Sequence, residues 1–382
     1  MDAGPPGLTM PKSGVFSETL PRPRFARYVP AWPLLAAVAL MLGWAGDGWA
    51  AGDAPPTGRI DLKVVGGLGG VSQYERYEQP FWRSRVTELT GGVVHAEIAP
   101  FDRAGFRAEE MLPLMRLGVV PFGTALLAVV SGEEPEFNAV DLPALNPDIG
   151  TLRETVQSYR PHLRKLLLER YNVELLSVYT YPAQVLWCSG AFSGLGDLAG
   201  RRIRTSSVGQ AEMVEALGAT AVVIPFANIV PAMRDGVVEC AVTGTMSGNT
   251  IGLPAVTTHV HAMAITWGVS VFGANVTAWQ ALPETVRAQL RAGLAELETS
   301  IWNGAERETG DGLDCSAGRP GCVDGKPGRL TVVPLTKADI DRRRQLLLTT
   351  VLPRWVERCG AECSAAWNAY LGPQLGIETQ PP

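Results

Sequence analysis

The chain has 382 residues, of which 46% are hydrophobic and 19% are charged, as in an ordinary globular protein. This length favours two domains, because a single hydrophobic core tends to stop growing at about 250–300 residues. The formal net charge is −5, which argues against nucleic acid as a partner, since such proteins carry a basic surface.

The N-terminal segment has the pattern of a secretory signal peptide. Arg22, Arg24 and Arg27 precede an apolar run over residues 31–44, and small residues follow it. The run is shorter than the roughly 20 residues that a membrane-spanning helix requires. We therefore predict a signal peptide over residues 1–50 and export of the mature protein.

Two details of the export signal follow from single residues. Cleavage is expected near Ala50 or Ala51, where small residues end the apolar run. The segment before the arginines is long for a signal, so translation could start at Met10 as well as at Met1. No cysteine precedes Cys188, which excludes a lipoprotein anchor.

After a linker at residues 51–59, strand-like and helix-like segments alternate, which indicates an α/β fold with crossover helices. The pattern predicts strands over residues 60–65, 93–98, 173–179, 185–188, 202–205, 220–224, 237–242 and 330–333. It predicts helices over residues 74–89, 109–117, 151–171, 207–217, 227–234, 283–307, 337–357 and 364–371. The helix that begins at Pro283 is long enough to span two lobes, and a loop is expected over residues 311–329.

The six cysteines favour an oxidising destination. Four of them form close pairs around short turns, which predicts two local disulfides, Cys315 with Cys322 and Cys359 with Cys363. Zinc is the alternative, but the closely spaced ligand pairs of a zinc site are absent. Cys188 and Cys240 lie within apolar runs, where buried free thiols are expected.

Catalytic chemistry has little support in the sequence. His259 and His261 would lie on one face of a strand and could ligate a metal, but a structural or solvated pair is the simpler interpretation. No serine lies in a nucleophile-elbow motif, and the glycine-rich stretch 66–70 lacks the spacing of a dinucleotide-binding loop. We predict no catalytic residue, no metal and no cofactor.

The sequence supports an anion-binding site better than a catalytic one. Arg201, Arg202 and Arg204 lie on a predicted strand just before a helix, whose first turn Ser206 or Ser207 would cap. Alternation along the strand places Arg202 and Arg204 on one face. Ligands of open α/β sheets bind at the carboxyl ends of strands, and a guanidinium fits a carboxylate bidentately. The alternative is a solvated strand edge.

Motifs along most of the chain resemble the solute-binding subunits of tripartite ATP-independent periplasmic (TRAP) transporters, of the DctP type. The similarity runs from about Leu62 to Gly372 and depends on many short motifs in the same order. These motifs are Glu88-Leu89-Thr90-Gly91-Gly92, Met115-Arg116-Leu117-Gly118, Pro135-Glu136-Phe137, Asp141-Leu142-Pro143, Leu198-Ala199-Gly200-Arg201-Arg202-Ile203-Arg204, Ala216-Leu217-Gly218-Ala219-Thr220, Pro225-Phe226-Ala227, Asp235-Gly236-Val237-Val238-Glu239 and Leu282-Pro283-Glu284.

The resemblance implies a two-lobed α/β fold like that of periplasmic binding proteins, with a ligand cleft between the lobes and a long bridging helix. It also implies a periplasmic protein that delivers a small organic acid to integral-membrane transporter subunits without using ATP. The expected boundaries are residues 60–181 plus 268–308 for lobe I, 182–267 plus 309–372 for lobe II, and 373–382 for a C-terminal tail.

The resemblance also implies where the ligand binds. In this family the arginine that closes the strand motif binds the ligand carboxylate, and here that residue is Arg204. Gln184 aligns with a second arginine of the family and Thr243 with an asparagine, so a monocarboxylate is expected and not a dicarboxylate or a sialic acid. The remaining expected ligand-binding residues are Trp187, Tyr74, Trp267 and Ser206. The three aromatic side chains among them are equally compatible with the core.

Two other functions remain open at this point. A ligand sensor that feeds a signalling receptor would have the same fold, and the genes beside this one would distinguish it from a transport protein. A periplasmic enzyme is the weaker alternative, and turnover of a ligand or stoichiometric metal would support it.

Overall fold

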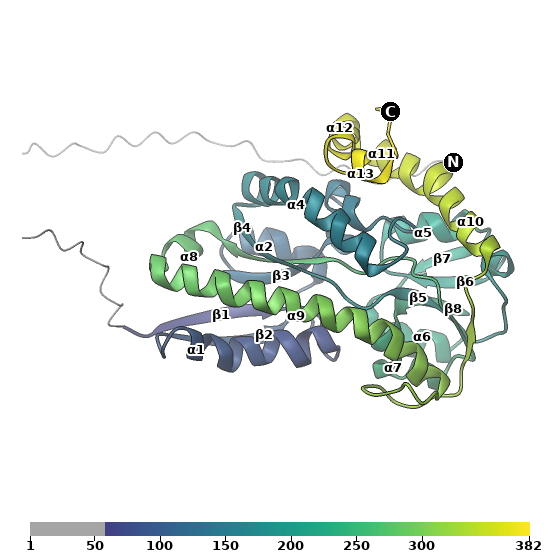
Figure 1. Ribbon diagram of the computed structural model, residues 1–382, viewed down its shortest axis with the longest axis horizontal. Coiled ribbons are helices and arrows are strands. Elements are labelled where there is room, and N and C mark those ends of the chain that lie inside the picture. The colour runs from purple at the N-terminus through teal and green to yellow at the C-terminus, as the bar shows by residue number, and fades with distance from the viewer. Residues whose placement is uncertain (1–57) are drawn as a thin grey trace, which may run out of the picture. The chain divides into compact units, whose positions relative to one another are not determined.

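Two β-sheets organise the chain in the computed structural model, which describes residues 58–382 (Figure 1). The predicted signal peptide and its cleavage site lie outside the described residues. The two sheets alternate with helices, which confirms the predicted α/β class. We refer to the five-stranded sheet and its helices as the first lobe, and to the six-stranded sheet and its helices as the second lobe.

The first sheet combines parallel strands with one antiparallel return strand. Its order is β2 (Val94–Pro100), β1 (Ile60–Gly66), β3 (Phe122–Leu126), β10 (Ser270–Asn275) and β4 (Val173–Tyr179). Strand β1 pairs in parallel with β2 and β3, whereas β10 runs antiparallel to both of its neighbours. Strand β10 therefore returns the chain to the first lobe after the second sheet has been built.

The second sheet has the same mixed character. Its order is β11 (Thr331–Val333), β9 (His259–His261), β5 (Gln184–Cys188), β8 (Cys240–Gly244), β6 (Arg202–Thr205) and β7 (Thr220–Val223). Strand β6 lies parallel to β7 and β8, so the helices that follow β6 and β8 begin at the same edge of the sheet. This edge carries Arg204 and Thr243.

Helices cover both sheets. Those of the first lobe are η1 (Gln73–Glu78), η2 (Phe81–Arg85), α1 (Val86–Leu89), η3 (Ala108–Glu110), α2 (Met111–Arg116), α3 (Leu127–Val130), η4 (Pro135–Asp141), α4 (Ile149–Tyr171) and α8 (Val276–Gln280). Those of the second lobe are η5 (Leu195–Leu198), α5 (Val208–Glu215), η6 (Phe226–Asn228), α6 (Ile229–Arg234), α7 (Thr245–Ile251) and η7 (Leu253–Ala255). The C-terminal helices are α10 (Lys337–Leu346), η8 (Leu347–Val351), α11 (Leu352–Cys359), α12 (Ala361–Tyr370) and α13 (Gly372–Leu375).

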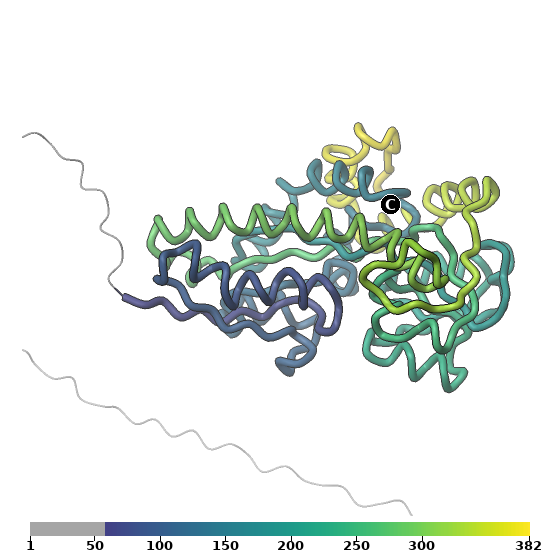
Figure 2. Tube along the Cα trace, turned by 60° about the horizontal axis from the view of Figure 1, so that its bottom comes forward, coloured from purple at the N-terminus to yellow at the C-terminus, as the bar shows by residue number. Residues whose placement is uncertain are grey.

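One long helix, α9 (Glu284–Ala317), packs against both lobes. Figures 1 and 2 show it running along the first lobe to the second, where its end lies beside α7. It contacts η1, α1 and β4 in the first lobe, and α7 and β11 in the second. The predicted bridging helix is therefore confirmed, but it is longer than expected and includes the beginning of the predicted loop.

Close packing against neighbouring elements accounts for two glycines within α9. A Cβ at position 312 would lie 2.4 Å from the backbone N of Met246, so only glycine allows α9 and α7 to pack this closely. A Cβ at position 304 would likewise lie 2.2 Å from the hydroxyl of Tyr77 in η1. The helix ends at Gly318, whose φ of 67° is a left-handed conformation that glycine adopts without strain.

Three disulfides join all six cysteines. The two predicted local pairs are confirmed. The prediction of free thiols at Cys188 and Cys240 was wrong, because these two residues are bonded to each other. They lie directly opposite one another on the antiparallel strands β5 and β8, with their Cα atoms 4.1 Å apart, and this register brings the two sulfur atoms together.

Candidate ligand-binding site

Arg204 is near the C-terminal end of β6 and is almost completely buried, with 3% of its surface exposed. Its Nε donates a hydrogen bond to the carbonyl of Ile224 at 2.8 Å, and its Nη1 donates to the carbonyl of Val242 at 2.6 Å. These bonds fix the guanidinium between β7 and β8. By contrast, Arg202 at the start of the same strand is exposed, so the solvated-edge alternative holds for Arg202 and not for Arg204.

The buried guanidinium of Arg204 lacks a compensating charge. Burial alone lowers its pKa to about 9, and no acidic group in the described part of the chain opposes that shift. A buried charge is costly unless it is paired. An anion that reached this guanidinium would supply the missing partner, so the electrostatics favour binding of a negatively charged group.

Gln210 connects two of the predicted ligand-binding residues. Its Nε2 donates to Oε1 of Gln184 at 3.0 Å and to the hydroxyl of Thr266 at 2.9 Å. Its Oε1 accepts from the backbone N and the hydroxyl of Ser206. Gln184 and Ser206 are therefore brought together through a residue that our sequence analysis did not select.

The cap of α5 places Gln210 in this network. Ser207 accepts a hydrogen bond from the backbone N of Gln210, and Gln210 follows it at the spacing of a capping box. Here, however, the glutamine side chain bonds Ser206 and Gln184 instead of closing the box on Ser207. The serine-to-glutamine spacing was thus a usable signal in the sequence, and it was missed.

The predicted aromatic residues lie in the core, which was the stated alternative. Trp187 is fully buried, and its indole donates to the carbonyl of Thr243 at 3.3 Å. The indole of Trp267 donates to the carbonyl of Asn146, and the hydroxyl of Tyr74 donates to the carbonyl of Ile98. Their polar atoms are therefore bonded within the chain, and nothing in this arrangement gives them a ligand-binding role. Thr243 is also buried, next to the strand end that Arg204 contacts.

Tyr181 links the glycine-rich loop of the first lobe to Gln184 of the second. Its hydroxyl accepts a hydrogen bond from the backbone N of Leu68 at 3.3 Å. Its ring lies against Gly268, where a Cβ would be 3.3 Å from the ring and 2.5 Å from Nε2 of Gln184. The loop that follows β1 and the Gln184 network are consequently neighbours across the connection between the lobes.

Two buried carboxyl groups support these connecting segments. Asp141 accepts hydrogen bonds from the backbone N atoms of Trp267, Gly268 and Val269, where the chain passes back to the first lobe. Glu78 accepts from the backbone N of Gly67 at 2.7 Å and from the side chains of Gln73 and Thr124. Burial raises the pKa of each group to about 7, although these donors oppose the shift.

We expect the free energy of unfolding to fall as pH rises from about 6 to about 8, because Glu78 and Asp141 take up protons on folding. In unfolded chains such groups titrate near pH 4. The stability that they provide is therefore complete below that pH and is lost as pH rises through about 7. Between about pH 6 and about pH 8, deprotonation of each group should lower the free energy of unfolding by about 1 kcal/mol. Urea unfolding at these two pH values measures the change.

The E78Q variant isolates one of these contributions. A neutral amide resembles protonated Glu78, and a 180° turn of the Gln73 amide would present its unpartnered Oε1 to the new NH₂ group. The change in unfolding free energy over the same pH interval should be smaller by about 1 kcal/mol in E78Q than in the parent. E97Q, at an exposed position of β2, should show the full parental change. Equal pH dependence in E78Q and the parent protein would contradict the assignment.

The histidine and cysteine clusters serve structural roles. Nδ1 of His261 accepts from the backbone N of Met263, and its Nε2 lies 3.4 Å from Asp339. Within residues 58–382, Asp311, Cys315 and Cys322 form the group of potential metal ligands. Both of its sulfur atoms are in a disulfide, and the Asp311 carboxylate accepts backbone N–H groups of the adjacent loop. This set does not resemble a metal site.

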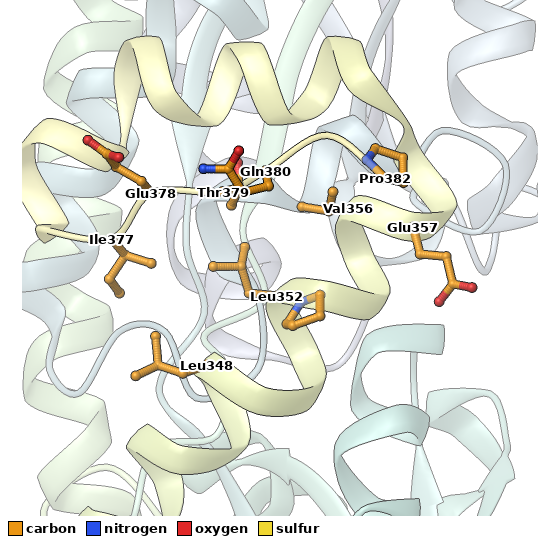
Figure 3. Close-up of a pocket in the computed structure, with 10 residues that line it drawn as sticks. Leu348, Leu352, Val356, Glu357, Ile377, Glu378, Thr379, Gln380 and Pro382 are labelled. Atoms are coloured by element: carbon orange, nitrogen blue, oxygen red, sulfur yellow. The ribbon is translucent and has the colours of Figure 1, made fainter.

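A groove of about 510 Å³ lies elsewhere, between the C-terminal helices and the end of the chain (Figure 3). Leu348, Leu352 and Val356 form its apolar wall, and the C-terminal segment 377–382 closes it. None of the predicted ligand-binding residues lines this groove. Separately, no helix in the described part of the chain combines the length and apolar character needed to cross a membrane.

The profile of the bacterial extracellular solute-binding proteins of family 7, DctP, matches residues 73–311. The chain belongs to this family. The family consists of solute-binding transport proteins and not of enzymes, and the resemblance inferred from the sequence motifs is confirmed. No curated protein matches the chain at a significant level.

Solved structures of TRAP solute-binding proteins share the fold of this family 7 member. An extracytoplasmic solute receptor from Bordetella pertussis that binds pyroglutamic acid matches with a TM-score of 0.72 and 20% identity, over 81% of this chain and 99% of that chain. A protein from Desulfovibrio salexigens with bound orotic acid matches with a TM-score of 0.71 and 18% identity, over 81% and 97% of the two chains. A protein from Rhodoferax ferrireducens with bound malonate matches with a TM-score of 0.70 and 20% identity, over 82% of this chain and 98% of that chain. The predicted two-lobed α/β fold is thereby confirmed.

Proposed function

We propose that this family 7 protein is the extracytoplasmic solute-binding subunit of a TRAP transporter and that it binds a small carboxylate at Arg204. The observation that carries the proposal is the buried guanidinium of Arg204, which has no acidic partner in the described chain. A carboxylate would accept charge-assisted hydrogen bonds from it and would offset the cost of its burial. The solved relatives with bound pyroglutamate, orotate and malonate support a carboxylate ligand.

The proposed site lies between the lobes. Arg204, Ser206 and Thr243 would provide the second-lobe side, together with Gln184 and Gln210. The proposed lobes comprise residues 60–181 plus 268–308 and residues 182–267 plus 309–372, with a tail at residues 373–382. Support comes from β10, which rejoins the first sheet, and from Tyr181, which joins the glycine-rich loop to the Gln184 network.

The proposed destination is the periplasm, and the proposed partners are integral-membrane TRAP subunits. An N-terminal signal peptide, cleaved near Ala50 or Ala51, would direct export. The bonding of all six cysteines in disulfides is consistent with an oxidising compartment. Delivery would depend on ligand-driven closure, since a ligand that binds the closed state more tightly shifts the equilibrium towards it.

A thermal-shift screen tests the ligand class. Purified protein is heated with a panel of small monocarboxylates, dicarboxylates, and the corresponding neutral amides. We expect a monocarboxylate to stabilise the protein by about 2.7 kcal/mol at a concentration of 100 times its Kd, whereas its amide should have no effect. Stabilisation by the amide equal to that by the acid would reject a site built on a guanidinium.

A further inference from the structure

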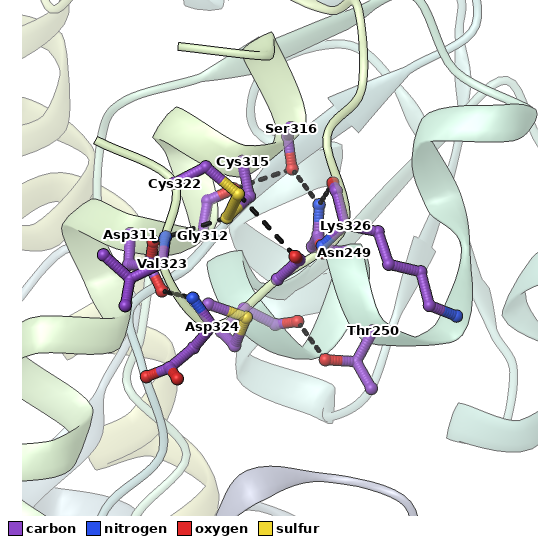
Figure 4. The surroundings of a disulfide bond; sticks show 12 residues. Asn249, Thr250, Asp311, Gly312, Cys315, Ser316, Cys322, Val323, Asp324 and Lys326 are labelled. Carbon is purple, nitrogen blue, oxygen red and sulfur yellow. Dashed lines mark hydrogen bonds between the residues drawn. A yellow bond between two sulfur atoms is a disulfide. The ribbon is translucent and has the colours of Figure 1, made fainter. Parts of the chain in front are cut away.

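The loop after α9, residues 318–330, is fastened to the end of that helix. The Cys315–Cys322 disulfide closes its first part (Figure 4). Next to the disulfide, the carboxylate of Asp311 accepts hydrogen bonds from the backbone N atoms of Val323 at 2.6 Å and Asp324 at 2.9 Å. The position of Asp324 is thus set by a covalent bond and two hydrogen bonds to α9.

The same loop is also attached to α7 of the second lobe. The side-chain amide of Asn249 accepts from the backbone N of Lys326 at 2.7 Å and donates to its carbonyl at 2.8 Å (Figure 4). Gly325 lies against Asn249 and Cys315, where a Cβ would be 2.6 Å from Oδ1 of Asn249. The loop is therefore held against the second lobe through α7.

Asp324 reaches from this loop to the first lobe. Its Oδ2 lies 2.8 Å from Nη1 of Arg76 in η1, and its backbone carbonyl accepts from Nη2 of Arg76 at 3.4 Å. η1 follows the glycine-rich loop that contacts Tyr181. The Arg76–Asp324 ion pair consequently joins the proposed cleft region of the first lobe to a rigid loop of the second.

A second carboxyl group faces this ion pair. Glu308 of α9 is buried, and its Oε1 has no hydrogen-bond partner in the described chain. Burial is the main reason that its pKa rises to about 7; Asp324 raises it further, while Arg76 and a hydrogen bond with Ser72 oppose the rise. Arg76 and Arg307 are accordingly the cations near Glu308, in a cluster that contains residues of η1, α9 and the loop.

We propose that Arg76 and Asp324 are positioning residues for ligand binding, which hold the two lobes together beside α9 while the disulfide-closed loop keeps Asp324 in place. This inference depends on the proposed function, because closure over a ligand gives the ion pair its role. Neither residue contacts the Arg204 network in this structure. The pair should therefore affect how long a ligand stays bound and not which ligand binds.

The size of the effect follows from the exposure of the pair. The two side chains are 44% and 43% exposed, so solvent screens their attraction. Loss of such a pair corresponds to a change of about two- to five-fold in an equilibrium constant. We expect D324N and R76Q each to raise the ligand dissociation rate by that factor, and the double variant to do no more than either single one.

The test uses the full mature protein and two readouts. The first is the dissociation rate of the monocarboxylate that stabilises the protein most in the thermal-shift screen. The second needs no ligand: spin labels at Glu97→Cys on β2 and Val223→Cys on β7, both exposed, report the distance between the lobes. These two cysteines should label selectively, because all native cysteines are in disulfides.

Controls separate positioning from folding. D314N removes the Asp314–Arg319 ion pair beside the same disulfide without affecting a contact between the lobes. The charge-reversed R76D/D324R variant should restore the parental dissociation rate and distance distribution. The proposal is supported if D324N and R76Q broaden the distance distribution while D314N does not. It is overturned if D324N behaves like D314N, or if the effects of the two single variants simply add. If no carboxylate binds, the proposed function fails, whereas the distance measurement still decides the role of the pair.

Discussion

Replacement of Arg204 by alanine is expected to weaken carboxylate binding by about 10- to 150-fold, because a charge-assisted hydrogen bond contributes about 1.5–3 kcal/mol. The parental guanidinium is already held in position by the carbonyls of Ile224 and Val242, so it loses little freedom when a ligand binds. Isothermal titration with the monocarboxylate selected by thermal shift measures the loss. R204K should be intermediate, since it keeps the charge but not the planar pair of donors.

Arg202 offers a matched control on the same strand. It is exposed and bonds the carbonyls of Val237 and Gly236. R202A should therefore bind ligand within about two-fold of the parent, as surface substitutions usually cost little. Circular dichroism would establish that R204A is folded, since two carbonyls, that of Val242 buried, lose their donor in that variant. A folded R204A with parental affinity would remove Arg204 from the site.

Loss of the Cys188–Cys240 disulfide should cost about 4 kcal/mol of unfolding free energy. The bond closes a loop between residues 52 positions apart, and the loss of entropy in the unfolded chain grows with loop length. The bond also joins the centre of the second sheet, where both residues are fully buried. Urea unfolding of C188A/C240A at constant pH measures the difference.

The C359A/C363A variant provides the comparison. Its disulfide spans four positions and joins the end of α11 to α12, so the same chain-entropy relation gives a cost of about 2 kcal/mol. We therefore expect the parent to be the most stable, C359A/C363A to be intermediate and C188A/C240A to be the least stable. A loss in C188A/C240A no greater than in C359A/C363A would show that chain entropy does not govern the stability of this sheet.

Much of the fold could be predicted from local patterns. The long helix over residues 151–171 was recognisable from its amphipathic spacing, and it is observed as α4 with Asp148 as its cap. The helix predicted from residue 337 is observed as α10, and Thr336 and Asp339 form a capping box at its start. The end of α9 was misjudged because Gly310 and Gly312 suggest a loop, whereas the close approach of α7 requires glycine at position 312. Strand β10 was missed, since its pairing partners are distant in sequence.

The candidate site was predictable only where residue type and strand position coincide. Arg204 follows both the strand pattern and the family motif, and the structure adds its burial between two carbonyls. Glu78 gave no sequence signal and Asp141 appeared only within a family motif, because their importance depends on backbone N–H groups from other segments. The Cys188–Cys240 bond was unforeseen for the same reason: register between β5 and β8 is a tertiary property.

The glycine contacts attach α9 closely to both lobes. Gly304 lies against Tyr77 of the first lobe and Gly312 against the backbone of α7. The residues between them are held as well, because the carbonyl of Glu308 accepts from the hydroxyl of Thr245 at 3.1 Å. A relative movement of the lobes would therefore have to break such contacts or bend the helix.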